Sequence, residues 1–207
     1  MAAIFRYELP KAAGGQRIGL YGGSFDPAHD AHVHVTKEAL KRFNLDRIWW
    51  LFSPGNPLKE DGPAPIETRL AFAKSLFQHR GVEMTDVEAV LGTKYTHDTL
   101  DVLQSKFPNV KFTWLMGADN LIQFDQWQNW QGIMNSMPVG VWARPGLRVG
   151  ARTSKAAQVF RRNRLPQRNS RAVSGSKSPA WCFTNIPMRS ESSSEIRASG
   201  QWGHGHF

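Results

Sequence analysis

Short apolar runs alternate with segments of helical periodicity along most of the chain, and this alternation restricts the possible folds more than any other feature. The expected strands lie at residues 17–21, 46–52, 82–87, 111–116, 138–143 and 180–184. Apolar residues at helical spacing predict helices at 30–43, at about 66–77 and from Thr96, which we expect to cap its helix. Strands separated by helices pair in parallel, with helices on both faces of the sheet. The sequence therefore predicts an α/β fold with a doubly wound parallel sheet in a single domain.

The last third of the chain departs from this regular pattern. We expect a basic helix over 153–163, capped by Thr153 or Ser154, and then a loose connection over 164–179 that is rich in Arg, Ser, Pro and Gly. A short helix at 193–199 would form a small C-terminal appendage. The predicted organisation comprises an N-terminal extension (1–16), one domain (17–199) with a basic insertion (147–180), and a C-terminal tail (200–207).

The positive charge of the chain is concentrated in this last third. The net charge is +9, and the stretch from Gln126 to Ser190 holds eleven Arg and Lys residues with no Asp or Glu. Such a field attracts polyphosphates or nucleic acid. An equally weighted alternative is a solvated basic face with no specific partner.

Cysteine content and hydropathy indicate the compartment. Cys182 is the single cysteine, so we expect no internal disulfide and a reducing environment, with this thiol buried and inert. No stretch approaches the roughly 18 apolar residues of a membrane span, and the N-terminus lacks a secretory pattern. We expect a soluble, cytoplasmic protein.

The strongest local signal is the segment Gly22–His32, which follows the first expected strand. Paired glycines at a turn let the backbone approach a phosphate or a base. His29 and His32 are three residues apart at a helix start, so both imidazoles can face one polyanion, which the helix N-terminus also attracts. Each feature alone is common. Together they indicate a phosphate-binding site.

A second cluster, Ser192–Arg197, lies near the end of the chain. Successive serines at a helix start offer hydroxyl and amide donors, and Arg197 lies within reach of the same anion. An ordinary capping box explains the same hexapeptide, and for this segment alone it is the preferred interpretation.

In combination these segments resemble the nucleotidyltransferase superfamily with the HxGH signature. Gly22–His32 is similar to its GG[ST]FDPxHxGH motif, with Ala31 in place of a glycine. Ser192–Arg197 is similar to its SSTxIR motif, with Ser194 in place of Thr, and Ser199 stands where a second basic residue is frequent.

Four further segments narrow the resemblance to the nicotinate mononucleotide adenylyltransferases. They match a P-x-x-P-x-K loop (53–59), a YTxDTL segment (95–100), a GxDxL stretch followed by WxxW (115–130) and an RPG tripeptide (144–146). The resemblance implies a Rossmann-like fold and transfer of the adenylyl group of ATP to nicotinate mononucleotide. The products would be nicotinate adenine dinucleotide and pyrophosphate, a step of NAD biosynthesis. Mg²⁺ would be bound through the ATP phosphates, with no protein metal site.

The resemblance also implies residue roles. His32 would reach the α-phosphate and His29 the outer phosphates, with Ser193, Ser194 and Arg197 on the β- and γ-phosphates. Other expected contacts to ATP are Gly22, Gly23, Ser24 and Phe25, with Gly117 and Asp119 at the ribose. For the acceptor, Trp127 would stack on the pyridine ring, Thr96 would contact the nicotinate carboxylate, and Lys59 would be a further phosphate contact. Trp49 and Trp50 are expected in the core, and His34 and His97 in structural or surface positions.

Two alternatives stay open at this level. One is an adenylyl- or cytidylyltransferase for another phosphorylated acceptor, such as phosphopantetheine or glycerol phosphate. The other is a non-catalytic nucleotide- or RNA-binding module on the same fold. Besides ATP and nicotinate mononucleotide we expect no nucleic acid and no membrane partner, and a homo-oligomer is left open.

Overall fold

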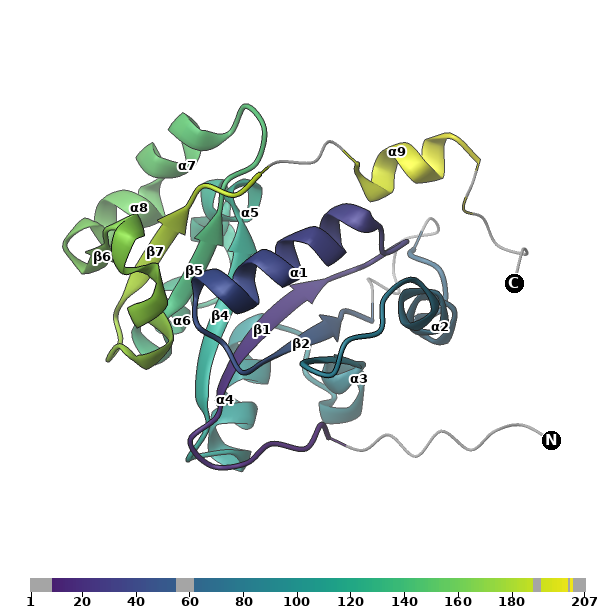
Figure 1. The fold of residues 1–207 in the computed structure, drawn as a ribbon, viewed down its shortest axis with the longest axis horizontal. Coiled ribbons are helices and arrows are strands. Elements are labelled where there is room, and N and C mark those ends of the chain that lie inside the picture. Colours follow the sequence, from purple (N-terminus) through teal and green to yellow (C-terminus); the bar gives the residue numbers. More distant parts are fainter. Residues whose placement is uncertain (1–8, 55–61, 188–190, 201, 203–207) are drawn as a thin grey trace.

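A seven-stranded parallel sheet forms the centre of the molecule. The computed structural model describes residues 9–54, 62–187, 191–200 and 202. The strands are β1 (Arg17–Gly23), β2 (Arg47–Phe52), β3 (Val82–Thr85), β4 (Lys111–Gly117), β5 (Val139–Trp142), β6 (Arg164–Leu165) and β7 (Trp181–Thr184). Their order in the sheet is β3-β2-β1-β4-β5-β7-β6, and every pairing is parallel (Figure 1). The predicted α/β fold is confirmed.

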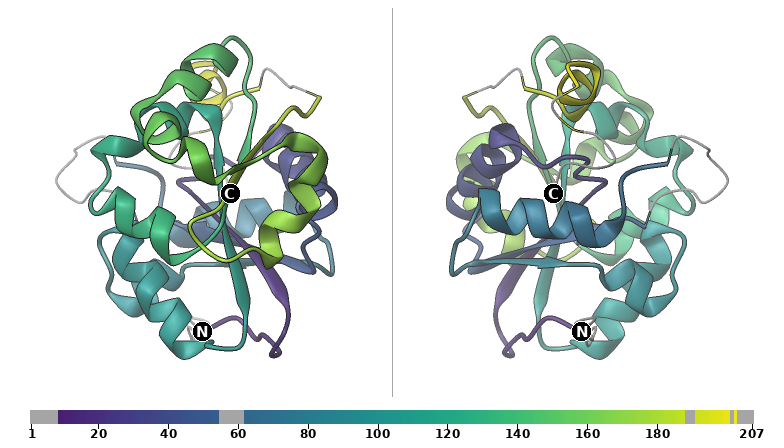
Figure 2. Two further views of the ribbon diagram at one scale, coloured as in Figure 1. Left: turned by 90° about the vertical axis from the view of Figure 1, so that its left-hand side faces the viewer. Right: turned by 90° about the vertical axis from the view of Figure 1, so that its right-hand side faces the viewer.

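Helices cover both faces of this sheet, as Figure 2 shows from two sides. The α-helices are α1 (Asp30–Arg42), α2 (Ile66–Leu76), α3 (Val87–Leu91), α4 (Thr96–Lys106), α5 (Ala118–Ile122), α6 (Trp130–Ser136), α7 (Arg148–Thr153), α8 (Lys155–Val159) and α9 (Ser193–Ala198). The 3-10 helices are η1 (Phe124–Gln126), η2 (Arg161–Asn163) and η3 (Gln167–Gly175). One face carries α1, α2 and η3, and helices α3 to α8 pack on the other.

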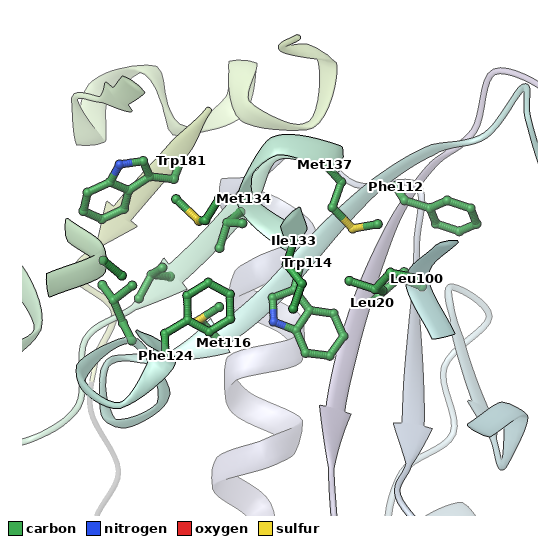
Figure 3. Close-up of a cluster of buried hydrophobic side chains, with 14 of the residues drawn as sticks. Leu20, Leu100, Phe112, Trp114, Met116, Phe124, Ile133, Met134, Met137 and Trp181 are labelled. Atoms are coloured by element: carbon green, nitrogen blue, oxygen red, sulfur yellow. The ribbon is translucent and has the colours of Figure 1, made fainter. Parts of the chain in front are cut away.

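Alternating side chains divide the core into these two layers. In β2, Trp49 points into the layer beneath α3 to α8 and Trp50 into the layer beneath α1 and α2, and both are 0% exposed. This period of two is what a strand buried on both faces requires. Figure 3 shows part of the first layer, where Trp114 of β4 and Trp181 of β7 belong to one cluster. The expected core position of Trp49 and Trp50 is confirmed.

The strand order changes direction at β1: β2 and β3 lie on one side of it, and β4 to β7 lie on the other. Strand β1 pairs with β2 on one side and with β4 on the other, so the loops that leave β1 and β4 diverge. A parallel sheet binds its ligand in the crevice at such a switch point, beyond the carboxyl ends of the strands. The topology therefore places the candidate site where Gly23 ends β1 and Gly117 ends β4.

The basic third is more structured than its composition predicts. The helix expected over 153–163 is wrong in its length: α8 begins after the predicted cap Ser154 but ends at Val159, and residues 161–163 form the 3-10 helix η2. Ser154 Oγ caps α8 by accepting a bond from the Ala157 N–H at 3.3 Å. The expected loose connection is also wrong: it contains β6 and η3, and η3 buries Val173 against the sheet. In α4, Tyr95 rather than Thr96 occupies the N-cap position.

The glycine pair does not form the expected turn. Gly22 and Gly23 are the last residues of β1 and pair with Leu51 and Phe52. The left-handed conformation falls instead on Phe25, whose φ is 46°. Gly22 is required for a different reason, since a Cβ there would lie 2.6 Å from Cη2 of Trp114.

We expect Gly22→Ala to destabilise the protein by about 1–3 kcal/mol, because the indole of Trp114 is 2% exposed and has no room to move. Urea unfolding measures this change. Gly175→Ala is the matched control, since a Cβ at Gly175 would meet no atom within 4 Å. Equal losses for the two variants would show that the Trp114 contact does not fix this position.

Candidate active site

Two histidines lie side by side where β1 passes into α1. The ring centroids of His29 and His32 are 3.9 Å apart. The backbone N–H of His29 donates to Nδ1 of His32 at 3.2 Å, so a neutral His32 carries its proton on Nε2. The expectation that both rings share one face is confirmed. His32 thereby presents an N–H donor in a fixed tautomer.

The surroundings of the pair favour the neutral form of both rings, because they lower both pKa values. Burial lowers the pKa of His32 well below its ordinary value, and His29 and Arg144 lower it further. The pKa of His29 is also lowered, by burial and then by Arg144, while Glu191 and Asp30 oppose the shift. A polyanion bound here would act against both shifts, because a negative charge favours the protonated ring.

Arg144 faces this pair from the end of β5. Its Nε lies 3.3 Å from Oδ1 of Asp119, and neither atom has a hydrogen-bond partner within the described part of the chain although both are buried. A Cβ at Gly117 would lie 2.2 Å from the same Asp119 oxygen. Gly117 therefore lets the Asp119 carboxylate fold back toward Arg144. Arg144 belongs to the RPG tripeptide of the sequence, for which the motif alone predicts no role.

The C-terminal motif packs on the β1–α1 loop (residues 24–29), although more than 160 residues separate them in sequence. Ser193 Oγ donates to the Pro27 carbonyl at 2.9 Å. The Arg197 guanidinium donates to the Asp26 carbonyl and also to Ser194 Oγ at 3.3 Å. Figure 1 shows α9 near the first turn of α1. The predicted His and Arg residues thus meet at one loop.

The capping interpretation of the Ser192–Arg197 segment is confirmed for Ser192, and its anion-binding interpretation stays a prediction. Ser192 is the N-cap of α9, and its hydroxyl accepts a bond from the Glu195 N–H at 3.2 Å. Ser193 and Arg197 contact the β1–α1 loop instead. The capping interpretation therefore explains one serine, and the loop contacts account for Ser193 and Arg197.

A buried arginine that the sequence did not indicate joins two connections at this site, the one between β1 and α1 and the one between β2 and α2. Arg69 of α2 is 0% exposed and donates to three carbonyls. These belong to Ala64 (2.6 Å), Ser53 (3.0 Å) and Ser24. The Asp26 carboxylate, 6% exposed, accepts from the Ala64 N–H at 3.3 Å. Residues of the phosphate motif are thus bound to both ends of the connection between β2 and α2.

The expected acceptor residues lie at the same end of the sheet. Trp127 is half-buried and packs edge-to-face on Phe124 at 5.2 Å and on Trp114 at 6.2 Å. Thr96 is half-buried and opens α4. Lys59 lies outside the described residues.

The remaining polar candidates have structural partners. His34 Nε2 lies 2.7 Å from the Pro187 carbonyl, and His97 lies between Asp98 (3.0 Å) and Asp101 (3.1 Å). Burial raises the pKa of the Cys182 thiol to about 11, so this fully buried group stays protonated. The structural roles expected for these residues agree with these contacts.

Within residues 9–54, 62–187, 191–200 and 202, no group of three or more His, Cys, Asp or Glu side chains is arranged to hold a metal ion. In the same part of the chain, no helix has the length and apolar character needed to cross a membrane.

Acidification should destabilise the ligand-free protein through His32. Because the folded-state pKa is depressed, the unfolded chain binds the proton first, and stability falls once the pH drops below about 6.5. Urea unfolding between about pH 7.5 and 5.5 should show a smaller loss for His32→Gln than for the wild type, by at most about 1.4 kcal/mol per pH unit. His34→Gln, on the same helix, should lose as much stability on acidification as the wild type. Equal pH slopes for the wild type and His32→Gln would contradict the assignment.

Comparison with known proteins agrees with this geometry. The cytidylyltransferase-like family matches residues 20–199. A protein of Roseobacter denitrificans, named "Probable nicotinate-nucleotide adenylyltransferase", is 58% identical over 197 residues, which cover 95% of this chain and 99% of the relative. A relative of the same name from Cereibacter sphaeroides is 56% identical over 185 residues, covering 89% and 98%. The structure titled "Plasmodium falciparum nicotinic acid mononucleotide adenylyltransferase complexed with NaAD" shares the fold, with a TM-score of 0.66 and 20% identity over 88% of this chain and 83% of that one. The chain belongs to the nicotinate-nucleotide adenylyltransferases of the cytidylyltransferase-like family.

Proposed function

We propose that this protein transfers the adenylyl group of ATP to nicotinate mononucleotide, giving nicotinate adenine dinucleotide and pyrophosphate. The observation that carries the proposal is the convergence of His29, His32 and Arg197 on one loop at the switch point of the sheet. These groups are donors and cations, which is what a polyphosphate requires. Family membership and identities above 50% with the named relatives support the same reaction.

The reaction is an in-line displacement at the α-phosphorus of ATP. A phosphate oxygen of the mononucleotide forms the new bond, and the bond from the α-phosphorus to the bridging oxygen breaks, so pyrophosphate leaves with the electron pair. The nucleophile is already an anion, so no general base is needed. Catalysis consists of positioning the substrates and stabilising the charge.

The histidines and α9 divide the triphosphate between them. The Nε2–H of His32 donates to the α-phosphate, where charge redistributes during the reaction. His29 contacts the outer phosphates together with Ser193, Ser194 and Arg197. Arg144 adds positive charge near both histidines, as the cause of their lowered pKa values indicates. Lys59 is a further phosphate contact in this proposal.

The nucleoside binds across the ends of β1 and β4. Backbone groups of Gly22, Gly23, Ser24 and Phe25 line the ATP site, and Gly117 and Asp119 receive the ribose, whose hydroxyls donate to a carboxylate. ATP enters as its complex with a divalent cation, Mg²⁺ in our proposal, which the triphosphate carries as part of the substrate.

The acceptor occupies the side of the site formed by α4 and the loop after β4. The indole of Trp127 stacks on the pyridine ring, and Thr96 donates to the nicotinate carboxylate. Trp127 is suited to this role because Phe124 and Trp114 hold its ring while part of it stays exposed.

The domain that carries this activity spans residues 17–199 in our proposal. A cytoplasmic location and the absence of a nucleic-acid partner stay predictions, and the oligomeric state stays open.

Nicotinate mononucleotide should be preferred over its amide counterpart by about ten- to a hundredfold in kcat/KM. Donors arranged around a carboxylate leave the NH₂ of the amide unpaired, which costs about 1–3 kcal/mol. A side-by-side assay of pyrophosphate release measures the ratio. Thr96→Val should reduce it, whereas His97→Gln, whose ring faces Asp98 and Asp101, should not. Equal kcat/KM for the two acceptors would defeat the assignment of Thr96.

His32→Ala should lower kcat by about 10²–10³ and leave the dissociation constant of ATP nearly unchanged, because its contact is made at the reacting phosphorus. His29→Ala should weaken ATP binding as well, since the outer phosphates are held in the ground state too. Steady-state kinetics and calorimetry with ATP separate the two effects. If His32→Ala loosens ATP without changing kcat, the roles of the two histidines must be exchanged.

A further inference from the structure

Trp202 lies beyond the segment that matches the family, in what the sequence indicates is a terminal tail. Its side chain is nevertheless buried, with 7% of the residue exposed. The indole Nε1–H donates to Oδ1 of Asp26 at 2.7 Å, and the ring packs edge-to-face on Phe72 of α2 at 4.9 Å. Trp202 is therefore attached to the phosphate motif itself.

The Asp26 carboxylate is shared between this indole and Arg197. Oδ1 accepts from Trp202 and from the Ala64 N–H, while Oδ2 lies 3.7 Å from the Arg197 guanidinium. That separation is longer than a hydrogen-bonded ion pair of about 2.7–2.9 Å. Arg197 instead donates to the Asp26 backbone carbonyl, and its side chain stays 43% exposed. The carboxylate thus attracts the guanidinium but forms no short, hydrogen-bonded ion pair with it.

We propose that Trp202 is a positioning residue for the reaction: by donating to the Asp26 carboxylate, it keeps Arg197 available to the β- and γ-phosphates of ATP. A buried carboxylate that loses one donor must find another, and the adjacent guanidinium is the strongest partner within reach. Without the indole donor, the carboxylate closes on Arg197 in a charge-assisted pair. Arg197 is then withdrawn from the triphosphate. The inference rests on the proposed function only in assigning ATP as the ligand of Arg197.

The test separates the indole N–H from the bulk of the ring. Trp202→Phe keeps an aromatic ring against Phe72 and removes the donor to Asp26. We expect the dissociation constant of ATP, measured by calorimetry without acceptor, to rise about five- to twentyfold. In kinetics the KM for ATP should rise by a similar factor, while the KM for nicotinate mononucleotide stays within about twofold. Binding measured without acceptor tests Trp202 even if the acceptor were a different phosphorylated compound.

Two controls distinguish positioning from general stability. Trp181→Phe removes a buried indole hydrogen bond of the same kind, from a residue of β7 to the Phe160 carbonyl at 2.8 Å. It should lower Tm and leave the ATP dissociation constant unchanged. Phe72→Leu reduces the ring contact and keeps the hydrogen bond, so it should also leave ATP binding within about twofold. Loss of ATP affinity in Phe72→Leu would overturn the proposal, because this variant keeps the hydrogen bond. That measurement also tests the proposal if Trp202→Phe does not fold.

The coupling to Arg197 decides the mechanism. In an Arg197→Ala background, Trp202→Phe should have no further effect on ATP binding, because the group that it positions is gone. If Trp202→Phe weakens ATP binding by the same factor in that background, it acts independently of Arg197 and the proposal fails. An unchanged ATP dissociation constant for Trp202→Phe in the wild-type background would also overturn it.

Discussion

The charges of Asp26 and Arg69 are buried together, and the site depends on the hydrogen bonds that satisfy them. An ionised group inside a protein costs several kcal/mol unless its surroundings supply partners. Arg69 donates to three carbonyls in two separate connections, and Asp26 accepts from a backbone amide and an indole. The carbonyls bound by Arg69 lie in the connections that follow β1 and β2. The need to satisfy two charges therefore fixes the loops around the phosphate motif relative to one another.

A second link joins the expected ATP site to the expected acceptor site through the core. Gly22, next to the last residue of β1, has no side chain, and the indole of Trp114 fills the space that a Cβ would take. Trp114 in turn packs on Trp127, the residue assigned to the pyridine ring. Close packing transmits displacement, because interiors have few voids to absorb it. The absence of a side chain at Gly22 thus makes room for Trp114, and Trp114 in turn supports Trp127, on which we place the pyridine ring of the acceptor.

The basic third has a structural part that composition did not indicate. Arg164 lies over the ring of Trp181 at 5.3 Å, and Arg171 donates to the Lys41 carbonyl and to Asn44. These contacts attach β6 to β7 and η3 to the C-terminal end of α1, so two of the eleven cations stabilise the fold. Others, such as Arg161 and Arg162, are exposed. The alternative of a solvated basic face therefore describes only part of this segment.

The sequence by itself determined the elements and the local motifs. Strand positions follow from a period of two, helix positions from a period near 3.6, and the His29–His32 pair from a spacing within one helical turn. These are local properties, and they placed six of the seven strands. The sequence failed at short polar elements such as β6 and η3, whose stability comes from the surface on which they pack. Only the tertiary structure decided the roles of Arg69, Asp26, Arg144 and Trp202. Their partners lie on other segments of the chain, as far as 176 residues away for Trp202 and Asp26, and no local pattern encodes such a contact.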